Sequence, residues 1–463
     1  MSAQLSRSES LSLLTITGAA VGVLLNTFQG DDDGNPLVAS IAFSFIAFTA
    51  TYSLIRWLGD VFMKAGFKGR DMGKLKKTEI PETMGAICAV VYLLVIIMFI
   101  PFPFYKDIVA ATSGGGNRDV ILQVEQVETG RFLHRFPHNK LAGFLSGILS
   151  LHSVVILGLG DDLFDIRWRH KVLIPAFASI PMLIVYFVDF GVTQVVVPTF
   201  LRPYLGVELF NIGWMYYAYM AAFTIFSTNS INILAGINGI EVAQSLVIAC
   251  LILLNDILYL APFAPFPHPA MDSHLFSIYL LLPFIGVSFA LLWHNWFPAK
   301  VFVGDTYCYF AGMVFAVDGI LGHFSKTLWL LFIPQAFNFV YSTPQLFHLI
   351  PCPRHRLPHF NIRTGLMEPS RVTFERPLRA PVQSVMKFMH KLRLLDIKTD
   401  ESEKVTESSN FTIINLWLVW FGPMREDRLA MGLLAFQMMC GLVGLVIRHR
   451  LALLIFSADN IQV

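Results

Sequence analysis

Long apolar segments alternate with short polar ones along most of the chain. Ten of them approach the roughly 20 consecutive apolar residues that a helix needs to cross the hydrocarbon of a bilayer. They lie at residues 37–58, 84–100, 141–159, 172–188, 212–226, 240–261, 275–293, 309–323, 327–349 and 429–447. The pattern therefore predicts an all-α, polytopic integral membrane protein with about ten transmembrane helices.

The ends and the longest loop differ from this core pattern. Residues 11–28 are weakly apolar, and they could form an extra span, a signal-like segment or an interfacial helix. We therefore divide the chain into an N-terminal extension, 1–36, and a ten-helix domain, 37–463. The loop between spans 9 and 10, residues 350–428, contains an amphipathic stretch at 382–395 that is typical of a helix lying at the membrane interface.

Composition narrows the class of protein further. Of the 463 residues, 55% are hydrophobic and only 14% are charged, whereas soluble domains carry about 25% charged residues. This excludes a soluble enzyme, a disordered scaffold and a nucleic-acid binder. The five cysteines are scattered without a CxxC pair, which argues against a disulfide framework and a zinc site.

The distribution of positive charge predicts the orientation in the membrane. The loops after odd-numbered spans hold 23 Lys and Arg, and those after even-numbered spans hold 7. The positive-inside rule therefore places the odd-numbered loops in the cytosol. The sequon Asn410-Phe411-Thr412 lies in one of them, so we expect it to stay unglycosylated.

The first polar motif follows the third span. Asp161 and Asp162 end an apolar helix, and a cationic run that ends at Lys171 comes next. Ionisable residues at the end of a membrane helix are costly and indicate function. The alternative is that both aspartates cap the span and pair with Arg167 or Lys171 at the surface.

A second motif follows the fifth span and is rich in amides. Asn229 and Asn232 are three residues apart, so they share a face if the segment is helical. Gly236 and Gly239 flank Asn238 and allow the backbone to approach a ligand closely. Amide oxygens together with a few carboxylates suit Mg²⁺. A polar break between two helices would explain the same residues.

Two further motifs lie on the same predicted side. Asp305 follows a glycine at the start of a span, and Phe302 nearby could stack on a flat ring or simply pack. Arg354, His355 and Arg356 stand between prolines in a stiff loop, where guanidinium groups suit phosphate oxygens. Contact with anionic lipid is the alternative for this basic cluster.

Carboxylates, amides and cations on one membrane face are what metal-assisted phosphoryl transfer requires. Their place in a membrane protein suggests that one substrate is a lipid. A transporter of nucleotide sugars, a sister transferase with another sugar or lipid, and a non-catalytic membrane protein are the competing interpretations. A transporter would place polar groups near the midplane and often show an internal repeat, whereas here the charges cluster at helix ends and no repeat is visible.

Five runs carry a resemblance to a known family. They are DDLFDIRWRHK, NSINILAGINGIE, VFVGDTYCYFAGM, GILGHFSK and PCPRHRLP. In these runs the sequence is similar to the polyprenyl-phosphate N-acetylhexosamine-1-phosphate transferases, and most similar to their eukaryotic branch, from about residue 37 to the C-terminus. Bacterial members usually carry aspartate at the position of Asn238 and a His-rich loop at the position of PRHR.

The resemblance implies a specific activity. Such enzymes transfer GlcNAc-1-phosphate from UDP-GlcNAc to dolichyl phosphate, giving GlcNAc-diphosphodolichol and UMP. This is the first step of lipid-linked oligosaccharide synthesis for protein N-glycosylation. The resemblance further implies Mg²⁺ as cofactor, ten spans in the endoplasmic reticulum membrane, a cytosolic active site, a homodimer and sensitivity to tunicamycin.

The resemblance also assigns roles to individual residues. Mg²⁺ would be bound by Asn232 and Asp305. The catalytic group would contain Asp161, Asp162 and Lys171, and we expect the two aspartates to position rather than to abstract a proton. Contacts with UDP-GlcNAc would come from Arg70, Asp71, Met72, Glu82, Asn238, Phe302, Arg354, His355 and Arg356. Dolichyl phosphate would meet Lys171, Ile225, Phe226, Ser227, Thr228, Asn229, Ser230, Ile231, Asn232 and Ile233.

One residue departs from the family pattern. Asp318 places a carboxylate inside a predicted span where relatives are apolar. Because an ion in the hydrocarbon is costly, we expect Asp318 to be neutral or paired with another group across the bundle.

Overall fold

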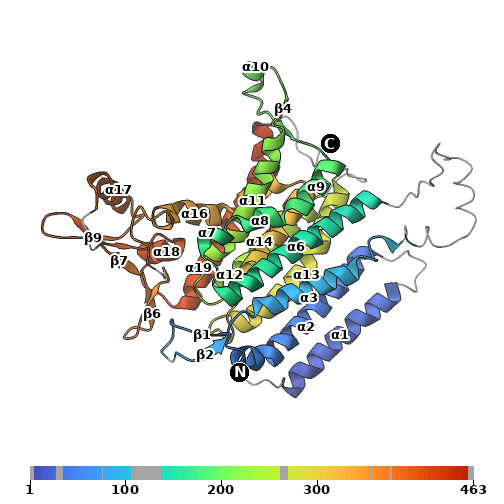
Figure 1. Ribbon diagram of the computed structural model, residues 1–463, viewed down its shortest axis with the longest axis horizontal. Coiled ribbons are helices and arrows are strands. Elements are labelled where there is room, and N and C mark those ends of the chain that lie inside the picture. Colours follow the sequence, from blue (N-terminus) through green and yellow to red (C-terminus); the bar gives the residue numbers. More distant parts are fainter. Residues whose placement is uncertain are drawn as a thin grey trace, which may run out of the picture.

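The computed structural model shows long helices lying side by side, with a lobe of short strands and helices at one end and a small hairpin at the other (Figure 1). It describes residues 5–27, 35–75, 77–105, 108, 137–260, 270–353, 356–374 and 378–456. The helices are α1 (Arg7–Thr27), α2 (Pro36–Lys64), α3 (Gly85–Phe99), α6 (His138–Phe164), α7 (Trp168–Lys171), α8 (Ile174–Ala178), α9 (Ile180–Asp189), α10 (Arg202–Leu205), α11 (Trp214–Ile233), α12 (Ile240–Ile257), α13 (Met271–Asn295), α14 (Asp305–Leu321), α15 (Ser325–Leu331), α16 (Ile333–Leu346), α17 (Ala380–Lys391), α18 (Ile413–Phe421) and α19 (Glu426–His449).

Six of the described helices are long and apolar enough to cross a membrane, so the chain is a multi-pass membrane protein. They are α1, α2, α6, α12, α13 and the helix that begins at Glu426. The count of ten is not confirmed. The span predicted at 172–188 is divided into α8 and α9 at Ser179, and the span at 327–349 is divided into α15 and α16 at Phe332. A proline is the second residue of each second half, and it lacks the N–H that would continue the hydrogen-bond ladder.

The all-α prediction is correct only in its coarse form of a mostly helical chain. The described residues also form four small antiparallel sheets outside the long helices. Strands of three to five residues are too short to give a recognisable period-2 pattern, which is why the sequence did not reveal them. The sheets pair β1 (Lys68–Arg70) with β2 (Glu79–Pro81), β3 (Gln194–Val196) with β4 (Leu209–Asn211), β5 (His359–Asn361) with β6 (Leu366–Glu368), and β9 (Val405–Ser409) with both β7 (Arg371–Thr373) and β8 (Ile397–Thr399).

The N-terminal helix α1 lies along α2 (Figure 1). The Thr17 hydroxyl donates to that of Thr49 at 2.9 Å, and the Tyr52 hydroxyl donates to Glu9 at 3.0 Å, so the two helices run antiparallel. Within α1, Ala20 is the one buried residue. Its length and its place beside α2 favour the extra-span interpretation among the three alternatives.

Helix α14 is the centre of the bundle, because every residue from 306 to 321 is buried. Glycines permit the close approach of its neighbours. A Cβ at Gly312 would lie 2.4 Å from the Ser227 carbonyl oxygen of α11, and one at Gly158 of α6 would lie 2.6 Å from the Thr306 Cα. These contacts fix the start of α14, where Asp305 stands, against α6 and α11.

Asp318 lies in the buried part of α14, and its two carboxylate oxygens have no hydrogen-bond partner among the described residues. This favours the neutral over the paired alternative, because an unpaired buried ion is very costly. Asp318→Val should therefore leave turnover within about twofold of wild type, as for a site remote from the chemistry. Initial rates of UMP release measure this, and a large loss of turnover at normal protein yield would contradict it.

The lobe between predicted spans 9 and 10 contains the predicted interfacial helix and the sequon. The stretch predicted at 382–395 overlaps α17 but begins two residues after its start and ends four residues beyond its end, and in α17 Met386 is buried while Val385 and Phe388 are exposed. The sequon residue Asn410 is buried and hydrogen-bonds Gln345 and Ser370, each at 2.8 Å. A glycan could not be attached to that side chain in the folded lobe, and the cytosolic location of the sequon stays a prediction.

Candidate functional site

The predicted motifs meet at one end of the helix bundle. Asp305 at the start of α14 is joined by Lys171 of α7 and Asn232 of α11. The Lys171 Nζ lies 3.0 Å from Asp305 Oδ2, and the Asn232 amide lies 2.7 Å from Asp305 Oδ1. Lys171 Nζ also lies 2.5 Å from Asp161 Oδ2. Three segments far apart in the sequence thus converge on one carboxylate.

The amide motif begins inside a helix, and this places the Asn232 side chain beside Asp305. Helix α11 continues through the motif to Ile233, so Asn229 and Asn232 do share a helical face, as the spacing predicts. Asn229 hydrogen-bonds the Ile225 carbonyl oxygen at 2.8 Å within its own helix. Asn232, by contrast, donates from its side-chain amide to Asp305 Oδ1.

The adjacent residues Asp161 and Asp162 have different hydrogen-bond partners. Asp162 accepts the backbone N–H of Asp305 at 2.7 Å and that of Thr306 at 3.2 Å, and it also accepts the Thr306 hydroxyl at 2.5 Å. It therefore satisfies the free N–H groups at the start of α14, where the N-cap residue Gly304 supplies no side chain. These bonds hold the Asp305 backbone in place, and the positioning role of Asp162 in the reaction stays a prediction.

The two carboxylates bonded to Lys171 differ in their exposure, and therefore in their access to a ligand. The side chain of Asp161 is 1% exposed and that of Asp305 is 37% exposed. Burial lowers the pKa of Lys171, but its bonds with Asp161 and Asp305 outweigh this and raise the pKa overall. The lysine therefore stays cationic beside the partly exposed carboxylate of Asp305.

Gly304 is required by the backbone at this point. Its φ is +81°, and a Cβ there would lie 2.7 Å from the Thr83 Cα and 2.9 Å from Asp162 Oδ2. A side chain would push α14 away from its cap. The sequence pattern of a glycine before Asp305 is thus explained by close packing rather than by contact with a ligand.

The β1–β2 hairpin packs on the segment before α14. The Phe302 N–H donates to the Pro81 carbonyl at 2.7 Å, and the Met84 N–H donates to the Phe302 carbonyl at 3.1 Å. A Cβ at Gly69 would lie 2.8 Å from the Phe302 ring, so that ring lies against the backbone of β1. Burial, followed by the charges of Asp162 and Asp305, raises the pKa of Glu82, which places this carboxyl in the same electrostatic environment.

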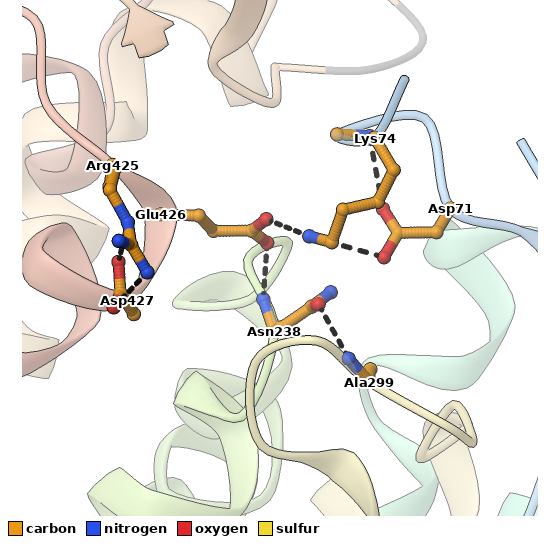
Figure 2. A network of polar contacts seen from close by, with 8 residues as sticks. Asp71, Lys74, Asn238, Ala299, Arg425, Glu426 and Asp427 are labelled. Carbon is orange, nitrogen blue, oxygen red and sulfur yellow. Dashed lines mark hydrogen bonds and ion pairs between the residues drawn. The ribbon is translucent and has the colours of Figure 1, made fainter. Parts of the chain in front are cut away.

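Asn238 belongs to a second polar group, shown in Figure 2. Its side-chain oxygen accepts the Ala299 N–H at 3.0 Å, and its own N–H donates to Glu426 at 2.7 Å. Glu426 also accepts Lys74 at 2.5 Å, and Lys74 lies 3.4 Å from Asp71. Asp71 and Asn238, both predicted to contact UDP-GlcNAc, are therefore connected through Lys74 and Glu426, to which the sequence analysis assigned no role.

The other residues predicted to contact UDP-GlcNAc are less firmly held by the rest of the protein. Arg70 pairs with Glu79 on the surface of the hairpin, and Met72 is exposed. The Nη1 atom of Arg356 is buried without a hydrogen-bond partner among the described residues, and its backbone carbonyl accepts Asn415 at 2.9 Å. Arg354 and His355 lie outside the described residues.

The stiff loop nevertheless lies at the same end as the other motifs. A Cβ at Gly236 would come within 2.0 Å of the Leu357 side chain, so Leu357 packs directly on the glycine loop before Asn238.

The predicted lipid-phosphate segment forms the last turns of α11. Ser227, Thr228, Ser230 and Ile231 are buried, and the Ser227 hydroxyl donates to the Gly312 carbonyl of α14 at 2.7 Å. These residues hold two helices together. Ile225, Phe226, Asn232 and Ile233 are partly exposed and remain accessible to a ligand.

The donor atoms around Asp305 suit a magnesium ion. Mg²⁺ is commonly bound by one or two carboxylates, with water and substrate phosphates as its other ligands. The accessible Asp305 carboxylate beside the Asn232 amide provides such a set. The described residues contain no cluster of three or more His, Cys, Asp or Glu with metal-binding geometry, so a zinc-like cage is not formed in that part of the chain.

The sequence reasoning missed Lys74, Phe297 and Glu426. Lys74 Nζ lies 4.1 Å from the Phe297 ring centroid as well as beside Glu426. The one available signal was an acidic residue at the start of a predicted membrane helix. It was not distinguishable from an ordinary charge in the first turn of a helix.

The chain is similar to known proteins over most of its length. The family model described as "Glycosyl transferase family 4" matches residues 144–323, which span α6 to α14 and contain Asp161, Lys171, Asn232 and Asp305.

Three similar curated proteins carry one name, UDP-N-acetylglucosamine–dolichyl-phosphate N-acetylglucosaminephosphotransferase. The Saccharomyces cerevisiae protein is 51% identical over 97% of this chain and 99% of its own length. The Schizosaccharomyces pombe protein is 49% identical over 96% of this chain and 98% of its own length. The Dictyostelium discoideum protein is 39% identical over 89% of each chain.

Proposed function

Because this chain belongs to the family of UDP-N-acetylglucosamine–dolichyl-phosphate N-acetylglucosaminephosphotransferases, we infer that it transfers GlcNAc-1-phosphate from UDP-GlcNAc to dolichyl phosphate. The products are GlcNAc-diphosphodolichol and UMP, in the first step of lipid-linked oligosaccharide synthesis for N-glycosylation. One structural observation supports this inference most directly. Lys171 and Asn232 both contact the accessible carboxylate of Asp305.

The reaction exchanges one phosphorus–oxygen bond for another. An oxygen of the dolichyl phosphate attacks the phosphorus next to GlcNAc, the bond from that phosphorus to the bridging oxygen breaks, and UMP leaves with the electron pair. A phosphate monoester has a second pKa near 6 and is largely dianionic at neutral pH. A strong general base is therefore not required, in keeping with the positioning role of Asp162.

We propose that Asp305 and Asn232 hold Mg²⁺, which would neutralise charge on the diphosphate and orient it. The bonds from Asp162 to the start of α14 keep the Asp305 backbone fixed. The high pKa of Lys171 keeps a positive charge beside the site, suited to the acceptor phosphate. Asp161, which is bonded to that lysine at 2.5 Å, fixes the position of its ammonium group.

The donor is proposed to lie between the β1–β2 hairpin and the Asn238 loop. Asn238 would contact the uracil and Phe302 would stack on it, while Arg70, Asp71, Met72 and Glu82 would contact UDP-GlcNAc. The buried Nη1 of Arg356, which has no hydrogen-bond partner within the described part of the chain, would donate to a phosphate or sugar oxygen. Arg354 and His355 are proposed in the same role from the sequence.

We further propose ten membrane crossings within residues 37–463 in addition to α1, location in the endoplasmic reticulum and a site that opens to the cytosol. The positive-inside count supports the orientation. The divided helices α8–α9 and α15–α16 would each make one interrupted crossing. A homodimer is proposed on the family resemblance alone.

One assay tests the function and its closest competitors. Purified protein in detergent should release UMP only when UDP-GlcNAc, a polyprenyl phosphate and Mg²⁺ are all present. UDP-GalNAc in place of UDP-GlcNAc, and undecaprenyl in place of dolichyl phosphate, should each reduce the rate and so exclude a sister transferase. A transporter would release no UMP under any of these conditions.

Asn238→Ala should raise the KM for UDP-GlcNAc up to about tenfold, because it removes the side chain proposed to hydrogen-bond the uracil and one such bond contributes about 0.5–1.5 kcal/mol. It also leaves the Ala299 N–H without its acceptor, which loosens the 297–299 segment beside the donor. The KM for dolichyl phosphate should change little. Initial rates at varied donor and acceptor concentrations measure both constants, and an unchanged donor KM would remove Asn238 from the donor site.

A further inference from the structure

Glu426, the first residue of α19, links segments that are remote in the sequence. Its side chain is 5% exposed, so the carboxylate is almost completely removed from water. One oxygen accepts the backbone N–H of Asn238 at 2.7 Å, and the other accepts Lys74 Nζ at 2.5 Å. Figure 2 shows the carboxylate between these two partners.

Each partner of Glu426 is held by a further contact. Lys74 Nζ lies 3.4 Å from Asp71 and 4.1 Å from the Phe297 ring centroid. The Asp71 carboxylate in turn accepts the Gly73 N–H at 3.0 Å, which closes the loop after β1. On the other side, the Asn238 amide oxygen accepts the Ala299 N–H. The carboxylate of Glu426 thus joins the hairpin loop, the Asn238 loop and the 297–299 segment.

The space around this carboxylate is tightly filled. A Cβ at Gly73 would come within 3.1 Å of Glu426 Oε2, so the hairpin loop lies directly against it. Hydrogen bonds to a charged group in a buried setting are shorter and stronger than neutral ones. Gly236 and Gly239 flank Asn238 and by themselves leave the backbone of this loop free to vary. The bond to Glu426 therefore fixes that backbone more firmly than the loop sequence alone could do.

We propose that Glu426 is a positioning residue for the nucleotide part of UDP-GlcNAc. It orients Asn238 through that residue's N–H and draws the hairpin loop towards it through Lys74. Glu426 itself has no need to touch the donor. The inference rests on the proposed function, and it adds a determinant of donor affinity that begins the last membrane helix and lies outside the matched family segment, 144–323.

The central test is a pair of kinetic constants for Glu426→Gln. The variant keeps the shape and an oxygen that can accept the Asn238 N–H, but it loses the charge opposite Lys74. We expect the KM for UDP-GlcNAc to rise about tenfold, since hydrogen bonds to charged groups are the stronger ones. The KM for dolichyl phosphate and kcat should stay within about twofold, as for loss of uniform binding.

A matched control comes from the next residue. Asp427 stands in the same first turn of α19 and pairs with Arg425 at 2.9 Å. Asp427→Asn removes a carboxylate from the same turn without touching Asn238 or Lys74, and it should leave the donor KM unchanged. A purely structural effect would lower the amount of active protein and hence kcat, with no selective change in the donor KM.

Lys74→Met supplies a second variant if Glu426→Gln folds poorly. The two substitutions remove the same ion pair, so the double variant should raise the donor KM no further than the single variants do. Calorimetric binding of UMP to each purified variant gives a readout without turnover, and it should weaken in parallel.

The outcomes separate this inference from the proposed function. If the wild-type protein makes no lipid-linked product, the proposed function is wrong. If the wild type is active but Glu426→Gln and Lys74→Met both keep wild-type donor KM and UMP affinity, the positioning role of Glu426 is wrong and the function stands.

Discussion

Asp305→Ala is expected to reduce turnover at least roughly a thousandfold, because metal-assisted stabilisation of phosphoryl charge contributes several kcal/mol. Asp305 is the accessible carboxylate on which Lys171 and Asn232 converge. Asn232→Ala removes the second proposed ligand and should have a similar effect. Initial rates of UMP release at saturating donor and acceptor measure the loss, and raising the Mg²⁺ concentration should restore part of it in Asn232→Ala.

Asp165→Asn is the control for these two variants. Asp165 is an exposed carboxylate just past the end of α6, with a φ of +47° that asparagine tolerates well. It should retain wild-type turnover. Full activity in Asp305→Ala, with the control also active, would remove the metal assignment.

Lys171→Met has the second largest expected effect, and it should act on both stability and turnover. It leaves Asp161, whose side chain is 1% exposed, without its ion partner. Removing one partner of a buried ion pair costs about 3–5 kcal/mol. We therefore expect a lower Tm in detergent together with a loss of UMP release of more than about a hundredfold.

A double variant separates the two effects of Lys171→Met. Asp161→Asn added to Lys171→Met removes the buried negative charge as well, so most of the lost stability should return. Turnover should stay low, because the cation beside Asp305 is still missing. Recovery of turnover together with Tm would show that Lys171 serves stability alone.

Much of the fold could be predicted because membrane helices need long apolar segments. Each predicted span coincides with a described helix or with two consecutive short ones. The breaks at Ser179 and Phe332 follow from Pro181 and Pro334, which the window of apolar residues does not register. The lobe between spans 9 and 10 contains strands of three to five residues, and their pairing depends on tertiary contacts that no local pattern carries.

The candidate site shows the same division. The spacing of Asn229 and Asn232 predicts a shared helical face, and the charge count places all motif loops at one end, where Asp305, Lys171 and Asn232 do meet. The different partners of Asp161 and Asp162 could not be read from two adjacent identical residues. Glu426 and Lys74 could not be found either, because their importance arises from a contact between positions 352 residues apart.

The most direct test of the account follows the phosphorus atom itself. Wild-type protein in detergent is supplied with dolichyl phosphate, Mg²⁺ and UDP-GlcNAc that carries a radioactive phosphorus next to the sugar. The account predicts that the label enters the lipid product together with GlcNAc, that the released UMP is unlabelled, and that EDTA stops both. Label in a released UDP, with GlcNAc on the lipid, would mean that the sugar moves without its phosphate and would contradict the account.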